Sequence, residues 1–250
     1  MKAARLAALL LAAVASVAGA QVQHLKFYGY AYDLKSGRYL YTEAHDHRAE
    51  GERWLGGTIR YYAPDATLLG EKTLEFRDDP FVPLYRFDLR ADGYFEAITK
   101  VGDEVWMQKR RTRDDRLREK AVAHASPMCA DSGFHALLHA RFAELMSGKP
   151  LDFTLGVAGN LDSYKFRAQR IADTTFEDKP AVRFRIEPDS VLRWFIDPLE
   201  VTYDPQLGKL LEYRGVANVP DPRSGKPYVV RIAYYSEPPG DVPKLPPLEP

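Results

Sequence analysis

The stretch FYGYAYDLKSGRYLYTE, residues 27–43, decides the fold class of this chain. Tyrosines alternate with small or aliphatic residues on both sides of the segment 33–37, and a period of two is typical of β-strands. Gly37 closes that segment, where a tight turn needs a residue that tolerates a positive φ. The stretch therefore predicts a β-hairpin.

The same pattern continues through the chain. An aspartate opens and a glycine closes two further turns, at 204–208 and 221–225, with a proline after each aspartate. Many short strands at close spacing predict a mainly β protein with a curved, half-barrel-like antiparallel sheet. The further strands are expected at Gly57–Tyr62, Leu69–Phe76, Leu84–Leu89, Tyr94–Lys100, Glu104–Thr112, Arg116–Ala123, Leu151–Val157, Tyr164–Arg170, Ala181–Glu187, Pro198–Tyr203, Lys209–Val216 and Tyr228–Tyr235.

One segment has a helical period instead. Apolar residues at positions 134, 137, 138, 142, 145 and 146 repeat about every 3.6 residues. Asp131 or Ser132 can cap the start of this helix, and Gly148 with Pro150 ends it. A strongly bent sheet needs apolar material in its concavity, so we expect the sheet to wrap round one long helix at 132–146.

The two ends of the chain differ from its middle. Residues 1–20 combine a basic start, an apolar run and the small residues Ala18-Gly19-Ala20, which predicts a secretory signal cleaved after Ala20 and a periplasmic location. The run is too short for a stable membrane span. Residues 21–235 are expected to form a single β-rich domain, and the proline-rich residues 236–250 an extended tail.

Composition excludes several classes of function. The chain has 35 basic and 35 acidic residues, and loss of the signal, with Lys2 and Arg5, leaves a net charge near −2. That charge gives no general attraction to nucleic acid. No cofactor motif occurs, and no second apolar run is long enough to span a membrane. Cys129 is the single cysteine, which excludes an internal disulfide; a buried apolar role is favoured over a reactive thiol near a helix start.

Several stretches carry a resemblance to a known family. They are Gly29–Asp33 with Gly37–Glu43, Asp131–Phe134 and Leu210–Asn218. Together they resemble an uncharacterised family of secreted proteobacterial periplasmic proteins, although Ser132-Gly133-Phe134-His135 departs from the pattern expected there. The resemblance implies a fold similar to the half-barrels of bacterial lipoprotein carriers and lipid-binding periplasmic proteins, and it implies no catalytic residue.

Two groups of side chains could hold a metal ion. Glu43, His45 and His47 alternate along one strand and so share a face, a spacing that suits zinc, although a solvated hairpin end is favoured over a metal site. His135 and His139 are four apart on the helix, but no glutamate follows His135 as in the H-E-x-x-H motif. Ser132 lacks the glycine-flanked turn of a serine nucleophile.

Two larger sets are candidate binding surfaces. Tyrosine joins apolar area to a polar hydroxyl, which suits the wall of a ligand site. Four cations on two strands would share a face if the strands pair, and could hold an anionic headgroup or an acidic partner. The alternative for the cations is an ordinary solvated face balanced by Glu187 and Glu212. The tyrosines are Tyr28, Tyr30, Tyr32, Tyr39 and Tyr41, and the cations are Lys165, Arg167, Arg183 and Arg185.

These patterns favour a non-enzymatic periplasmic binding or envelope-maintenance protein. Its ligand would be lipid-like or otherwise apolar, or its partner another envelope protein. Two alternatives stay open: a metal-dependent hydrolase that uses Glu43, His45 and His47, and a scaffold that binds only another protein.

Overall fold

The hairpin predicted for residues 27–43 is formed by β1 (Val22–Asp33) and β2 (Tyr39–Glu50). Its turn has the expected chemistry. The Gly37 N–H donates to the Asp33 carbonyl oxygen over 2.9 Å, and Gly37 has a φ of 71°. The Asp33 side chain accepts a hydrogen bond from the Ser36 N–H. The other two predicted turns repeat this arrangement at Gly208 and Gly225.

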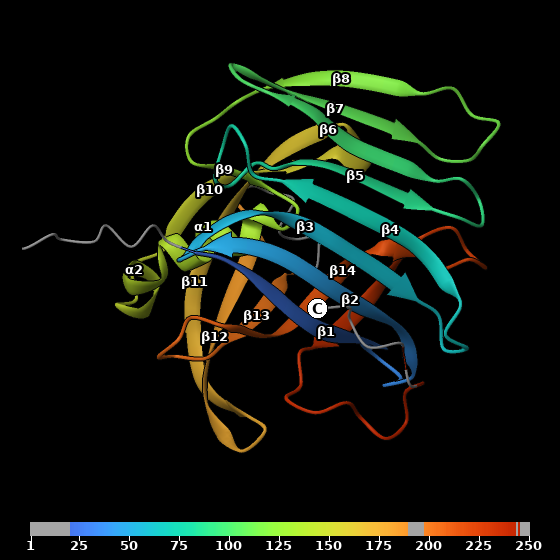
Figure 1. Cartoon of the computed structure of the whole chain (residues 1–250). Coiled ribbons are helices and arrows are strands. Elements are labelled where there is room, and N and C mark those ends of the chain that lie inside the picture. Colours follow the sequence, from blue (N-terminus) through green and yellow to red (C-terminus); the bar gives the residue numbers. More distant parts are fainter. Residues whose placement is uncertain (1–20, 190–197, 244, 246–250) are drawn as a thin grey trace, which may run out of the picture.

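The computed structural model describes residues 21–189, 198–243 and 245. Within these ranges fifteen strands form one curved, open sheet (Figure 1). The fold is therefore mainly β, as predicted. The remaining strands are β3 (Arg53–Tyr62), β4 (Leu68–Glu75), β5 (Leu84–Leu89), β6 (Phe95–Val101), β7 (Glu104–Arg110), β8 (Arg118–Ala123), β9 (Met128–Ala130), β10 (Leu151–Val157), β11 (Asp162–Phe176), β12 (Lys179–Pro188), β13 (Leu199–Tyr203), β14 (Leu210–Pro220) and β15 (Pro227–Ala233).

Strand β1, the first of the described strands, lies in the middle of the sheet. Strand β1 pairs with β2 on one side and with β15 on the other. From β1 the chain meanders outward to the edge strand β8, crosses to the opposite edge at β9, and meanders back to β15. The only parallel pair among the described strands is β9 with β10.

The prediction of one long helix is wrong, because the helical segment is interrupted. Two short helices, α1 (Gly133–Ala140) and α2 (Phe142–Met146), replace it, and they meet at Arg141 with φ −109° and ψ 15°. The break lets Phe142 turn onto the curved wall, where its ring lies 5.8 Å from that of Phe184 and 5.7 Å from that of Tyr203. A straight helix of fifteen residues would extend for roughly 22 Å and could not follow that curve. Neither Asp131 nor Ser132 makes a side-chain cap.

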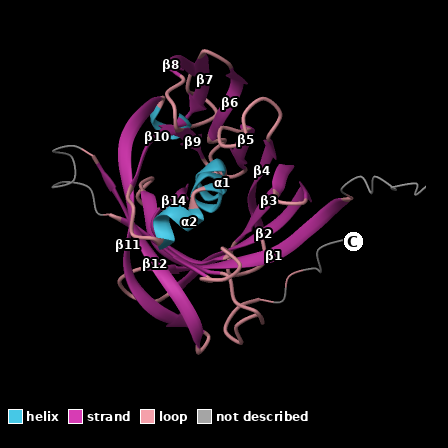
Figure 2. Cartoon of the chain, turned by 90° about the vertical axis from the view of Figure 1, so that its left-hand side faces the viewer, coloured by secondary structure: helices cyan, strands magenta, loops and turns pink. Residues whose placement is uncertain are grey.

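Both helices lie on the inner side of the sheet (Figure 2). Leu137, Leu138 and Leu145 are fully buried there against strands β10 to β13. Cys129 belongs to the same cluster, so its buried apolar role is confirmed, and burial raises the pKa of its thiol. Among the described residues, no helix is both long and apolar enough to cross a membrane.

Side chains bridge the two ends of the open sheet. Lys120 on β8 lies 3.1 Å from Asp162 on β11. Lys109 on β7 donates a hydrogen bond to the carbonyl oxygen of Gly159, in the short 3-10 turn η1 (Ala158–Asn160) that precedes β11. The sheet therefore surrounds an interior space without closing by backbone hydrogen bonds.

The start of the proline-rich tail lies against the outer face of the sheet. The Ser236 N–H and hydroxyl both donate to the Glu177 carboxylate, at 3.2 and 3.0 Å. Further along, Asp241 comes near Tyr32. Burial, and next this carboxylate, raise the pKa of Tyr32 to about 12.

Candidate functional site

A row of inward-facing side chains crosses the first half of the sheet at one level. Cross-strand pairing joins Phe27, His45, Ile59, Lys72, Phe87, Glu96 and Lys109 in that order, from β1 to β7. Polar and apolar members alternate from Phe27 to Glu96, and a second polar residue, Lys109, follows Glu96 directly. Because adjacent strands lie about 4.8 Å apart, His45, Lys72 and Glu96 recur roughly every 10 Å along the sheet. An apolar concave surface thus carries polar groups at intervals.

All members of this row except Phe87 line a large cavity that is partly open to solvent. Its volume is about 1690 Å³, and strands from both halves of the sheet contribute to its wall together with the start of α1. Aromatic side chains form much of the lining, including Phe27, Trp54, Tyr61, Phe134 and Tyr234. The two short helices therefore leave much of the concavity unfilled.

Glu43, His45 and His47 form a chain of hydrogen bonds along the inner face of β2. The Nε2 atom of His45 lies 3.1 Å from Oε2 of Glu43, and its Nδ1 atom lies 3.0 Å from Nε2 of His47. All three side chains are buried. Aromatic rings cover the two histidines: Phe27 stacks on His45 at 4.4 Å, and Trp54 lies 4.6 Å from His47.

Burial determines the protonation state of His47, the last residue in this row of hydrogen bonds. Desolvation, and next the neighbouring His45, lower the pKa of His47 from 6.5 to about 2, so His47 is neutral at physiological pH. When His45 is also neutral it donates from Nε2 to the Glu43 carboxylate and accepts from His47 Nε2. His47 Nδ1 is then a bare acceptor, and it has no hydrogen-bond partner among the described residues.

The predicted metal site has the expected residues on one face but not a common centre. Glu43, His45 and His47 bond to one another in line, with His45 between the other two. Among the residues that the structure describes, no group of three or more His, Cys, Asp or Glu side chains is arranged to hold a metal ion.

Two more polar groups sit deeper in the cavity. Lys72, 1% exposed, pairs with Asp131 at the start of α1, and Asn218 of β14 donates to the same carboxylate over 3.1 Å. These bonds tie both halves of the sheet to the helix. Glu96 accepts hydrogen bonds from the hydroxyls of Tyr85 and Tyr94, at 3.0 and 2.6 Å, and burial raises the pKa of its carboxyl.

The predicted tyrosine wall is divided between the two faces of the sheet. Tyr41 shares the inner face of β2 with Glu43. Tyr30, Tyr32 and Tyr39 lie on the outer face, where Tyr32 and Tyr39 rings are 5.8 Å apart. Tyr28 stands at the margin: it lines the cavity, yet its ring is 6.2 Å from that of Tyr30.

The two basic strands are neighbours, as the hypothesis required, because β11 pairs with β12. The three arginines face outward and have acidic partners, whereas Lys165 belongs to the cavity lining. Arg167 makes a bidentate contact with Asp152, at 2.6 and 3.0 Å. Arg185 lies 3.2 Å and Arg183 3.8 Å from Glu200. The remaining cation, Lys165, is exposed. Acidic side chains therefore balance most of the positive charge on this outer face.

The helix histidines take part in packing. His135 Nδ1 lies 3.0 Å from the Tyr203 hydroxyl, and the two rings stack at 5.6 Å. His139 lies 6.1 Å from His135 between ring centres. Ser132 contacts the Asp131 carboxylate through its backbone N–H and its hydroxyl. No histidine accepts a bond from this serine in the described part of the chain.

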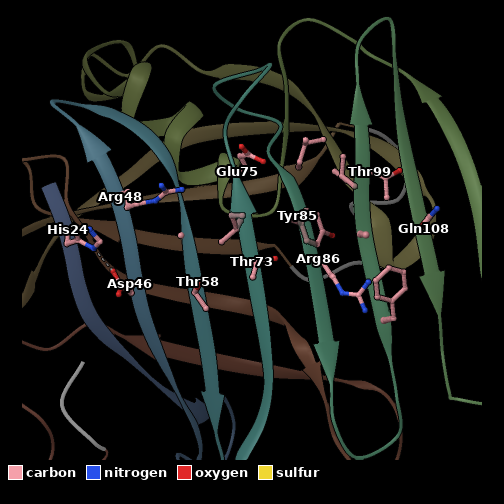
Figure 3. Close-up of a pocket in the computed structure, with 16 residues that line it drawn as sticks. His24, Asp46, Arg48, Thr58, Thr73, Glu75, Tyr85, Arg86, Thr99 and Gln108 are labelled. Carbon is pink, nitrogen blue, oxygen red and sulfur yellow. Dashed lines mark hydrogen bonds and ion pairs between the residues drawn. The ribbon is translucent and has the colours of Figure 1, made fainter. Parts of the chain in front are cut away.

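A second, shallower hollow of about 790 Å³ lies on the outer face of strands β1 to β7 (Figure 3). Small hydroxyl side chains such as Thr58 and Thr73 line its floor. The ion pair between His24 and Asp46, at 3.1 Å, stands on one side. On the other side Arg86 pairs with Asp88 and stacks on Phe95. Its floor is polar, unlike the aromatic inner cavity.

Sequence reasoning missed Lys72, Glu96 and Trp54 as site residues, and it considered Asp131 only as a helix cap. A usable signal exists for the first two. Lys72 stands between Gly70 and Leu74, and Glu96 between Tyr94 and Ile98, so each charge occupies the inward phase of its strand. A charge in that phase is rarely buried unless it is paired or functional.

No protein-family model, curated protein or solved structure matches this chain. The function is therefore argued from the cavity and its residues.

Proposed function

We propose that this chain is a non-enzymatic binding protein that holds a lipid-like, amphiphilic ligand in the cavity of its curved sheet. The observation that carries this proposal is the cavity of about 1690 Å³. Sites for small molecules usually measure about 300–1,000 Å³ and combine apolar walls with a few placed polar groups. This cavity has the same chemistry on a larger scale, which suits a long apolar body with one polar end.

A metal-dependent hydrolase is the less supported alternative. Both ring nitrogens of His45 already make hydrogen bonds, one to Glu43 and one to His47, so His45 has no free nitrogen for a metal. Hydrolysis also needs a nucleophile or activated water, and Ser132 contacts an aspartate rather than a histidine. Metal analysis of the purified protein, with activity assays against ester substrates, separates this function from binding.

The binding function is tested by measuring how tightly the purified protein binds a neutral fluorescent probe, N-phenyl-1-naphthylamine. Val157 lines the cavity, and Val157→Trp should fill part of it and weaken probe binding at least several-fold. Val229→Trp is the matched control, because Val229 is 40% exposed and lies outside the cavity lining. Solvent extraction and mass spectrometry should find a co-purified amphiphile. Equal binding by both variants would contradict the proposal, and absence of any binding would favour the protein-only scaffold.

The proposal places the protein in the periplasm after removal of residues 1–20. The basic start, apolar run and Ala18-Gly19-Ala20 support it. N-terminal sequencing of the exported protein should find Gln21 first. A first residue of Met1, or one inside β1, would contradict export by this signal.

A further inference from the structure

Four tyrosines surround the buried carboxylate of Glu43. Tyr61 is its cross-strand neighbour on β3, Tyr41 lies two residues before it on β2, and the Tyr234 hydroxyl is 3.5 Å from its Oε2 atom. Burial first, and then the Glu43 charge, raise the pKa of Tyr41, Tyr61 and Tyr213. We name these four tyrosines and Glu43 the tyrosine cage; its members are Tyr41, Glu43, Tyr61, Tyr213 and Tyr234.

The cage is built closely enough to hold its shape. Tyr41 and Tyr61 are 1% and 2% exposed, and their ring centres are 6.1 Å apart. Gly29 lies opposite Glu43 on β1. A Cβ atom there would come within 2.7 Å of the Tyr234 ring and 3.2 Å of Glu43 Oε2. The absence of a side chain at Gly29 is therefore what lets Tyr234 approach the carboxylate.

Polar atoms in and beside the cage lack partners. The Tyr41 hydroxyl and His47 Nδ1 are buried without a hydrogen bond in the described part of the chain. Glu43 uses Oε2 for both of its hydrogen bonds, to His45 and Tyr234, so Oε1 accepts none within the same residues. Buried polar groups are normally satisfied, so each unsatisfied one calls for a missing partner. In and beside the cage, the buried atoms that call for a partner are the Tyr41 hydroxyl and the His47 Nδ1 nitrogen.

The cage also lacks a positive charge from a lysine or arginine. Lys72 is paired with Asp131, and no lysine or arginine forms an ion pair with Glu43 among the described residues. Glu96 differs, because burial raises the pKa of its carboxyl but the nearby Lys72 charge opposes that rise, and Lys109 is its cross-strand neighbour. Four tyrosines surround Glu43, whereas two donate to Glu96, and the basic side chain that contacts Glu43 is the His45 imidazole, 3.1 Å away.

Building on the proposed function, we infer that the tyrosine cage receives an ammonium group at the polar end of the bound amphiphile. Tyrosine faces attract cations through their ring quadrupoles, and several rings together are the usual means of binding quaternary ammonium groups. The Glu43 carboxylate supplies the opposite charge that a desolvated cation needs. An anionic end, a carboxylate or a phosphate, would meet the like charge of Glu43 in the same place.

The test compares three probes that share one eight-carbon chain: octylammonium, octanol and octanoate. Isothermal titration of the purified protein should give the ammonium probe a Kd about tenfold lower than that of octanol, and octanoate the weakest binding. Glu43→Gln should bring the first two Kd values together. Glu71→Gln is the matched control, because Glu71 is exposed and pairs with Arg60 on the outer face.

Paired variants at one ring separate the cage from general packing. Tyr234→Phe keeps the aromatic face and should keep the preference for the ammonium probe. Tyr234→Leu removes the face and should reduce the preference several-fold, while thermal melting confirms that both variants fold. A preference that survives Glu43→Gln would overturn the inference.

The possible outcomes also distinguish this inference from the proposed function. Equal or tighter binding of octanol or octanoate by the native protein would overturn the cation cage but leave an amphiphile-binding protein. Binding of none of the three probes would remove the proposed function itself, and the cage with it.

Discussion

Single glycines determine where several strands of this sheet reverse direction. The φ values of Gly37, Gly208 and Gly225 are 71°, 60° and 65°. This is a left-handed backbone conformation, which costs a residue with a Cβ atom about 1–2 kcal/mol. At each turn the glycine N–H donates to the carbonyl oxygen of the aspartate four residues earlier. The pairing of aspartate and glycine in the sequence was therefore sufficient to predict the turns.

Gly225→Ala tests this conformational requirement without steric complication. A Cβ atom at Gly225 meets nothing within 4 Å, so only the backbone strain should be measured. We expect the free energy of unfolding in urea to fall by about 1 kcal/mol. Gly102→Ala is the control, because Gly102 also has open space and no positive φ. Equal effects of the two substitutions would contradict the argument.

His47 should make the protein less stable as the pH falls below neutrality. The unfolded chain binds a proton at His47 near its ordinary pKa of 6.5, whereas burial holds the folded pKa at about 2. Protons therefore favour unfolding between these values, and stability is lost as the pH falls through 6.5.

The measurement is urea unfolding between pH 7.5 and pH 5. Below pH 6.5, each histidine kept neutral contributes a loss of up to about 1.4 kcal/mol per pH unit. His47→Gln should make this loss smaller, whereas His24→Gln, at an exposed position, should leave it unchanged. Identical pH profiles for the native protein and His47→Gln would show that His47 is not held neutral.

At the scale of elements, periodicity predicted strands well and the helix poorly. Alternation is a property of each strand alone, and every expected strand is present. Strand β9 has three residues, too few to show a period, and it was missed. The helix breaks at Arg141 because α2 must follow the curve of the sheet. The apolar period of the helical segment carries no information about that curvature.

The helix still anchors the interior, which Leu138→Asp tests. Leu138 is fully buried among residues of α1 and strands β10 to β13. An unpaired carboxylate there costs several kcal/mol, comparable with the total stability of a domain. We expect the variant to be unfolded by circular dichroism. Leu207→Asp, 71% exposed, should melt like the native protein; native-like melting of Leu138→Asp as well would show that α1 is dispensable.

At the scale of the whole molecule, the pairing of strands that are far apart in the chain could not be predicted from the sequence. Nothing local shows that β1 pairs with β15, or that the chain crosses from β8 to β9. The site shows the same limit. The shared face of Glu43, His45 and His47 follows from spacing, but the tyrosines that enclose Glu43 come from strands and segments up to 191 residues away. Only the folded sheet brings Tyr234 to Glu43.

An open sheet must protect its two edges, and this chain does so differently at each. The edge strand β9 is buried, and its Ala130 N–H donates to the Phe81 carbonyl oxygen over 3.0 Å. The edge strand β8 instead exposes Arg118, Glu119 and Lys120. Charged side chains on an exposed edge hinder pairing with the edge of another molecule.

The double change Arg118→Val with Glu119→Val should therefore cause self-association rather than unfolding. Surface substitutions of this kind alter stability by about 0.5 kcal/mol or less, so the melting temperature should stay nearly constant. Light scattering should show association that grows with protein concentration. Arg77→Val with Asp78→Val removes the same charges from the loop between β4 and β5, away from any strand edge, and should stay monodisperse. If both double variants associate equally, apolar surface alone is responsible, and the charges on β8 have no special role in protecting the edge.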